Sequence, residues 1–190
     1  DNNIFDQGRI VCGGMGSFEK CSAEWAKPTV IGTANSVYIE DNSFYKTVGG
    51  GGNVIDANRG ASYVARFNTV GGKTQFMTHS LQSANERGTR NWEIYNNTFS
   101  VDSWTWAAMF IRSGTGVIWG NIFDSSYGYC VLFDNVRSFY AVSGTGPTGL
   151  CDGSSDWDSN HESNGWACRD QIGRGHDQWV WTVTNPYPPQ

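Results

Sequence analysis

The sequence predicts an all-β protein whose chain winds into a parallel β-helix, a solenoid of about five coils. The first observation behind this prediction is a repeat, apolar-x-apolar-x-x-Asn-x-apolar, found four times when glycine is allowed in the first place of the fourth copy. The four copies are Val37–Phe44, Tyr63–Val70, Trp92–Phe99 and Gly116–Phe123. The second observation is composition: charged residues make up only 16% of the chain, and its 24 glycines are typical of a turn-rich β protein.

Each repeat is interpreted as a short strand followed by a corner. Two apolar residues two places apart describe a strand with one face turned inward. The asparagine that follows lies at a bend, where its side chain bonds backbone groups and its tolerance of positive φ helps the chain to turn. The four asparagines are separated by 26, 29 and 24 residues, so stacked coils bring them together as an inward ladder. Its members are Asn42, Asn68, Asn97 and Asn121.

Further strands and loops complete the predicted coils. Second strands are expected at Val30-Ile31, Val54-Ile55, Met109–Ile111 and Val131–Phe133, and a fifth copy of the repeat, without its asparagine, at 137–142. Longer loops are expected at 47–53, 71–90 and 100–106. The alternative is a β-sandwich in which the repeat recurs by chance, but no Asn-Gly dipeptide stands between alternating runs to favour hairpins.

The domain organisation follows from the extent of the repeat. Residues 1–29 are expected to cap one end, 30–142 to form the coils, and 143–190 to be an irregular segment at the other end. The Pro-rich stretch 186–190 is typical of a linker, which leaves open that the chain continues into a longer protein. A coil stack has open ends, so a failed cap predicts association of copies into oligomers or fibres.

The five cysteines point to an oxidising compartment. The simplest pairing by spacing is Cys12–Cys21 and Cys151–Cys168, which leaves Cys130 as a buried, free thiol in an apolar run. Two disulfides in the terminal segments predict a secreted or cell-surface protein. Five free thiols would remove that argument.

At this point the chain resembles a known family. The Asn-x-Phe corners on short β-branched strands, over residues 30–142, are similar to those of right-handed parallel β-helix proteins, the pectate-lyase-like superfamily. The segment 165–175 is similar to stretches that follow such repeats in secreted bacterial proteins. The resemblance implies a right-handed winding and no particular activity, because this fold carries lyases, hydrolases, epimerases, tailspikes and adhesins.

Charge and hydropathy exclude some partners. Lys plus Arg is 13 and Asp plus Glu is 18, so the net charge is −5 and no basic cluster exists for a nucleic acid. The longest apolar run, Trp106–Ile111, is far below the ~18 residues that cross a bilayer, so no membrane span is expected.

One outward column of the coils is the candidate substrate-binding surface. The fourth place of each repeat points outward, and these places hold Glu40, Arg66, Tyr95, Trp119 and, by extension, Tyr140. Three aromatic rings in file beside a Glu and an Arg suit sugar rings, whose C–H faces pack on aromatic planes. The alternative is an aromatic stack covered by the loop 71–90 or by the C-terminal segment.

Catalytic and metal-binding motifs are weak. A glycosidase needs two carboxylates about 5 to 9.5 Å apart, and a lyase needs a general base. Glu40, Arg66 and Glu93 could supply such groups, but we interpret them as solvated charges on the strands. Three aspartates, Asp152, Asp156 and Asp158, carry oxygen ligands that suit Ca²⁺, although a polar loop explains them equally well. No other cofactor is expected. The histidines His79, His161 and His176 belong to no metal motif and are interpreted as structural or solvent-facing.

Three functions remain after these observations. The leading one is extracellular recognition of a polysaccharide or glycan surface, alone or within a larger polysaccharide-active protein. The second is a structural or adhesive surface protein that assembles through its ends. The third is a polysaccharide lyase or glycoside hydrolase, since catalytic residues on β-helices are poorly marked in sequence.

Overall fold

The computed structural model describes residues 2–7, 9–13, 31–34, 36–46, 52–58, 60–79, 88–134 and 172. These residues form fourteen short strands and no helix. The strands are β1 Ile4–Asp6, β2 Ile10–Gly13, β3 Val37–Glu40, β4 Ser43–Lys46, β5 Gly52–Asn58, β6 Ser62–Arg66, β7 Thr69–Gly72, β8 Thr74–Thr78, β9 Asn91–Tyr95, β10 Thr98–Phe99, β11 Thr105–Ile111, β12 Thr115–Trp119, β13 Ile122–Phe123 and β14 Tyr127–Phe133. No helix of this part of the chain is long and apolar enough to cross a membrane.

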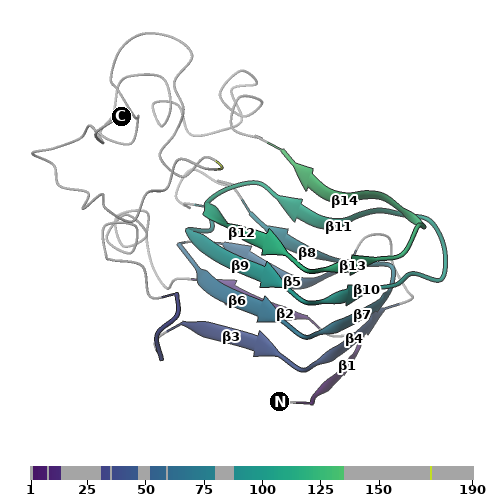
Figure 1. Cartoon of the computed structure of the whole chain (residues 1–190), viewed down its shortest axis with the longest axis horizontal. Helices are drawn as coiled ribbons and strands as arrows, with labels where there is room; N and C mark the ends of the chain where they lie inside the picture. The colour runs from purple at the N-terminus through teal and green to yellow at the C-terminus, as the bar shows by residue number, and fades with distance from the viewer. Residues whose placement is uncertain are drawn as a thin grey trace, which may run out of the picture.

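The strands pair in parallel within three sheets. Sheet A has the order β1-β4-β7-β10-β13, sheet B the order β14-β11-β8-β5-β2, and sheet C the order β12-β9-β6-β3. Neighbours in every sheet are one coil apart in the chain, so each complete coil supplies one strand to each sheet in the order C, A, B, while β1 and β2 belong to a first coil without a described strand in sheet C (Figure 1). The fold is a parallel β-solenoid, as the repeat predicts.

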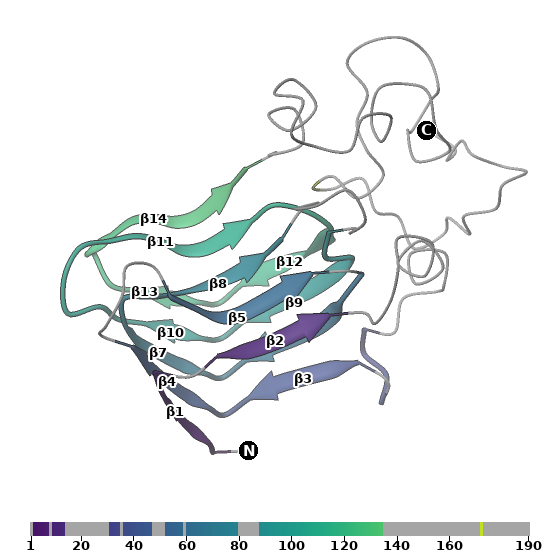
Figure 2. The same ribbon diagram turned by 180° about the vertical axis from the view of Figure 1, so that it is seen from behind.

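The coils wind in the right-handed sense. In Figure 1 the strands of sheet C run to the right in front, and later coils lie above earlier ones. Figure 2 shows the molecule from behind, where the strands of sheet B run to the right and those of sheet C run to the left, so the two sheets run in opposite directions in space. Parallel crossover connections are right-handed in nearly all proteins, because the twist of the strands packs only that way.

Strands begin earlier in the chain than the sequence indicates. Ile4–Asp6 pairs with β4 and Ile10–Gly13 pairs with β5, so parts of the expected cap 1–29 belong to sheets A and B. Ile31, by contrast, lies in a turn and not in a strand. The expected fifth copy at 137–142 lies outside the described residues.

The expected loop 71–90 was placed wrongly. Its first part continues β7 to Gly72 and then forms β8, Thr74–Thr78, in the middle of sheet B. The strand was missed because its only strongly apolar residues, Phe76 and Met77, are adjacent and therefore show no period of two.

Aromatic rings fill the core along sheet A. The inward residues of successive strands are Phe5, Phe44, Val70, Phe99 and Phe123. Parallel ring pairs form at both ends of this column, where Phe5 lies on Phe44 and Phe99 lies on Phe123 with centroids 4.8 and 5.2 Å apart. Val70 interrupts the column, and Phe76 from sheet B contacts both Phe44 and Phe99 edge-on.

The indole of Trp92 explains why the fourth repeat has a glycine, Gly116, in its first place. The residue pairs with Trp92 of the coil below. A Cβ on Gly116 would collide with the carbonyl oxygen and the indole ring of Trp92. The indole therefore occupies the space that an inward side chain at position 116 would need.

Candidate functional site

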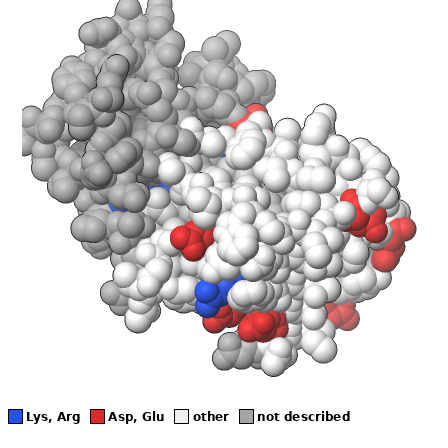
Figure 3. Space-filling model, in the orientation of Figure 1, with Lys and Arg blue, Asp and Glu red and all other residues white. Residues whose placement is uncertain are grey.

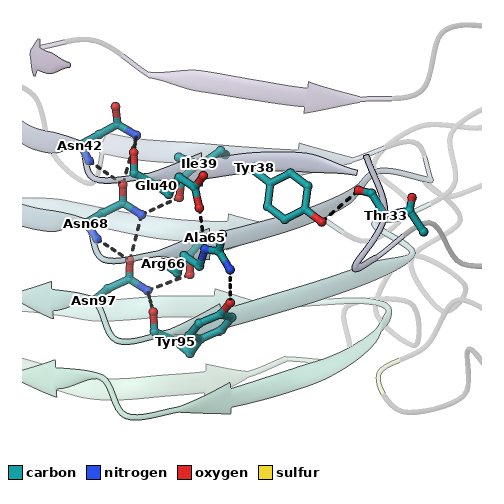
Figure 4. A network of polar contacts seen from close by, with 10 residues as sticks. All are labelled: Thr33, Tyr38, Ile39, Glu40, Asn42, Ala65, Arg66, Asn68, Tyr95 and Asn97. Carbon is teal, nitrogen blue, oxygen red and sulfur yellow. Dashed lines mark hydrogen bonds and ion pairs between the residues drawn. The ribbon is translucent and has the colours of Figure 1, made fainter. Parts of the chain in front are cut away.

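An asparagine ladder runs along the corner between sheets C and A (Figure 4). The Oδ1 of Asn68 accepts from the backbone N–H and the Nδ2 of Asn42, at 3.1 and 3.2 Å. The Oδ1 of Asn97 accepts from the same two groups of Asn68 at 3.0 and 2.9 Å, and Asn121 accepts from Asn97 at 3.0 and 2.9 Å. The predicted ladder is therefore present. Asn3 adds a member that the sequence did not indicate, since its Nδ2 donates to Asn42 Oδ1 at 3.1 Å.

The residue before each ladder asparagine, and not the asparagine itself, turns the corner. Positive φ values between 53° and 62° occur at the five preceding positions, Asn2, Asp41, Phe67, Asn96 and Gly120. The expectation that the ladder asparagines supply the left-handed conformation was therefore wrong by one position. Their role is to bond backbone groups, as when Asn68 Nδ2 donates to Ile39 O at 2.8 Å.

The predicted outward column is formed on sheet C. Register places Glu40 opposite Arg66, Arg66 opposite Tyr95, and Tyr95 opposite Trp119. Trp119 is 54% exposed and Tyr95 is partly exposed. The fifth expected member, Tyr140, lies outside the described residues. Of the expected covering loop 71–90, residues 71–72 end β7 in sheet A and residues 74–78 form β8 in sheet B, while residues 80–87 lie outside the described part of the chain.

Arg66 links the members of the column. Its Nε donates to Glu40 Oε2 at 2.5 Å and its Nη1 donates to the Tyr95 hydroxyl oxygen at 2.7 Å (Figure 4). The guanidinium carbon also lies 5.5 Å from the Tyr38 ring centroid and 5.7 Å from that of Phe67. The hydrogen bonds to Tyr95 and Glu40 raise the pKa of Arg66 above its ordinary value. Arg66 therefore stays protonated and is unsuited to act as a general base.

Tyr95 and Trp119 stack along the solenoid axis. Their centroids are 4.8 Å apart and their planes differ by 9°, which matches the spacing of neighbouring strands. The two rings cover one face of each other, so the pair presents ring edges and the outer face of Trp119. A flat aromatic platform facing outward from the sheet, as the sequence suggested, is not what these two rings form.

Phe67 is the residue of this surface that the sequence analysis missed. Its φ is 57° and its ring is 50% exposed. The ring meets Tyr95 nearly at a right angle, with centroids 6.1 Å apart and an interplanar angle of 82°. A non-glycine residue with positive φ is uncommon, and for a bulky side chain the cost is about 1–2 kcal/mol. The signal in the sequence is that Phe67 stands where other coils have Asn, Asp or Gly.

Replacing Phe67 with Asn is expected to raise the free energy of unfolding by about 1 kcal/mol. Asn tolerates the left-handed conformation, and this gain exceeds the loss of the contacts that the half-exposed ring makes with Arg66 and Tyr95. Urea denaturation measures the change. The matched control is Asn96→Phe one coil further on, which should lower the stability by a similar amount; a Phe67→Asn variant less stable than the wild type would show that the ring is retained for packing.

The cysteine predictions are met only in part by the described residues. Cys12 is buried in β2 and carries a free thiol, whose pKa burial raises to about 11 with a contribution from Asp56. The expected bridge from Cys12 is therefore not formed here, and Cys21, Cys151 and Cys168 lie outside the described residues. Cys130 is free but exposed, not buried as expected, because the outermost strand of sheet B has no described coil above it.

No metal site appears among the described residues. No group of three or more His, Cys, Asp and Glu side chains lies close enough together there to hold an ion. The expected calcium ligands Asp152, Asp156 and Asp158 lie outside the described part of the chain.

A second polar cluster lies on sheet B. The imidazole Nε2 of His79 lies 2.6 Å from Asp56 Oδ1, and Arg9 Nη1 donates to Asp56 Oδ2 at 3.2 Å. Burial alone would raise the pKa of Asp56, but the interactions with His79 and Arg9 outweigh it and the net shift is downward. His79 is 8% exposed, so it is a buried partner of Asp56, in line with the structural role expected for it.

The fold and the site define the class as a parallel β-solenoid with an asparagine ladder and an aromatic outer face on sheet C. No family model, curated protein or solved structure matches this chain.

Proposed function

We propose that the protein is an extracellular carbohydrate-recognising β-solenoid and that a glycan binds the outer face of sheet C at Phe67, Tyr95 and Trp119. The observation that carries this proposal is the half-exposed Phe67 ring on a left-handed backbone. Strain of this kind persists at functional sites, where the side chain is retained at a cost in stability.

The ring geometry supports a defined place for one sugar unit. The outer face of Trp119 is free of other described rings, because β12 is the last strand of sheet C. Phe67 adds a ring nearly perpendicular to the Tyr95–Trp119 pair. A pyranose therefore stacks on the outer face of Trp119, and Phe67, two strands away across Tyr95, offers an apolar contact to a neighbouring unit of the glycan.

Polar groups beside the rings suit sugar hydroxyls. Arg66 uses Nε and Nη1 for Glu40 and Tyr95, so its Nη2 is left to donate to a ligand. The carboxylate of Glu40 accepts hydrogen bonds, and the Glu40 side chain is 26% exposed. The two groups lie next to the aromatic rings on neighbouring strands.

Charge favours a neutral glycan. Arg66 is the basic residue of this column and Glu40 already neutralises it, while Glu93 of β9 adds a further negative charge nearby. Figure 3 shows that this face of the molecule is largely uncharged, with isolated acidic and basic groups. A polyanionic chain would meet little compensating charge here and a net charge of −5 overall.

Trp119→Ala is expected to weaken binding of a neutral oligosaccharide at least tenfold. The ligand would be selected on a glycan array and its affinity measured by calorimetry, where tenfold corresponds to about 1.4 kcal/mol. Trp104→Ala is the matched control, since Trp104 is 69% exposed and lies outside sheet C. Equal affinity of the wild type, Trp119→Ala and Phe67→Asn for every ligand found would rule out this face.

Secretion and bacterial origin belong to the same proposal. They are supported by the low charge, the many aromatic residues and the Asn-x-Phe corners, which resemble those of the pectate-lyase-like superfamily. Recognition is favoured over a lyase or hydrolase because Arg66 stays protonated and is tied to Glu40.

A further inference from the structure

Exposed isoleucines mark the two outer strands of sheet A. The outward column that runs through this sheet holds Ile4, Ser43, Thr69, Thr98 and Ile122. Its middle members carry hydroxyl groups, whereas Ile4 on β1 is 82% exposed and Ile122 on β13 is 65% exposed. Apolar residues at both ends of an otherwise polar column indicate surfaces that a partner covers.

The asparagine ladder has a direction, and its two ends complement each other. Asn3, Asn42, Asn68 and Asn97 each donate through the backbone N–H and Nδ2 to the Oδ1 of the next coil. Asn121, the last described member, has no such acceptor for its backbone N–H among the described residues. At the opposite end of the ladder, the Oδ1 of Asn3 accepts no hydrogen bond from any described residue. The Asn121 end of the ladder therefore lacks an acceptor, and the Asn3 end carries an unused one.

We propose that a second copy of this chain stacks head to tail on the first, with β13 and β14 of one copy against β1 and β2 of the next. The coil-to-coil register then places Ile122 beside Ile4 and Phe123 against Phe5. Asn121 donates to Asn3 Oδ1 of the next copy, and the ladder continues across the junction. This inference does not rest on glycan binding.

Sheet B continues in the same arrangement. Its inward columns end in Val131 and Phe133 on β14 and in Ile10 and Cys12 on β2. Phe133 occupies an inward place yet is 57% exposed, because no described coil covers it. A second copy would set Val131 against Ile10, and its first coil would cover the ring of Phe133.

One contact opposes the stack. Asp6 and Asp124 end the second outward column of sheet A, so the junction brings the two carboxylates one strand spacing apart, about 4.8 Å. Like charges on neighbouring strands destabilise pairing, and charges on outer strands limit edge-to-edge growth. The association is therefore reversible, and head-to-tail contacts of this kind leave a free end at each step.

Sedimentation velocity of the 190-residue chain over a range of concentrations tests the proposal. The wild type should show masses that grow with concentration in steps of 20.9 kDa. Ile122→Lys should be monomeric, whereas Thr69→Lys, the same change in the middle of the column, should associate like the wild type. Asp124→Asn should associate at several-fold lower concentration.

Mixing two blocked variants tests the head-to-tail geometry. Ile4→Lys and Ile122→Lys should each be monomeric, but their mixture should form dimers and nothing larger, because one native junction remains. A monomeric wild type together with a monomeric Asp124→Asn would overturn the proposal and would indicate that residues 135–190 of the same chain cover the end. Loss of association in Thr69→Lys equal to that in Ile122→Lys would also overturn it.

Discussion

Asn68→Ala is expected to lower the free energy of unfolding by about 3–5 kcal/mol. Asn68 is 1% exposed and makes four contacts through its side chain: it accepts twice from Asn42 and donates to Ile39 O and Asn97 Oδ1. Alanine removes all four and leaves the Asn42 N–H without a partner in a buried corner. Each such buried, unpaired group costs about 1–3 kcal/mol, which is why the effect exceeds the loss of one ordinary hydrogen bond.

Asn121→Ala is the matched control for this prediction. Asn121 has the same role in the outermost described coil but is partly exposed, so water replaces part of what it loses. Urea denaturation should therefore give a loss for Asn121→Ala of about half that for Asn68→Ala or less. Equal losses at the two positions would mean that the ladder acts through something other than buried hydrogen bonds. Association of copies, measured in parallel, must be excluded at the concentration used.

The spacing of the asparagines predicted the ladder because a corner is a local event that recurs once in each coil. Asn-x-Phe at 42, 97 and 121 reports both the buried amide and the inward ring of the next strand. Asn3-Ile4-Phe5 carries the same signal, but the positions of its apolar pair do not both fall within residues 1–190, so the full repeat cannot be recognised there. The repeat therefore predicts a cap where the structure has β1 and β2.

The sequence predicts which residues form the column of the candidate site, but not how their rings are oriented. Register follows from the repeat, so the opposition of Arg66, Tyr95 and Trp119 was predicted from sequence. The orientation of the rings depends on side-chain rotation, which no repeat encodes, and a stack along the axis replaced the expected platform. The repeat does not mark Phe67, because it predicts the left-handed conformation at the asparagine that follows, one position too late.

Phe76→Ala is expected to cost about 3–5 kcal/mol, the usual loss for a fully buried phenylalanine. Phe76 has no exposed surface and contacts Phe44 and Phe99 with its edge, at centroid distances of 6.4 and 4.9 Å. It lies in the coil whose sheet A residue is Val70, so its ring occupies space that a phenylalanine takes in the coils at both ends of the column. Removing it leaves a cavity between two rings that cannot close, because backbone pairing fixes the strands on either side.

The shared space can be tested with a swap. Val70→Phe alone should cost about 1–3 kcal/mol, because the added ring collides with Phe76. In the double variant Val70→Phe with Phe76→Val, the new ring completes the sheet A column and the vacated space absorbs it. The loss of unfolding free energy in this double variant, measured by urea denaturation, should be at least about 1 kcal/mol smaller than the sum of the losses in Val70→Phe and Phe76→Val. Strict additivity would show that residues 70 and 76 do not compete for one volume, and would refute the account of why the phenylalanine column is interrupted at Val70.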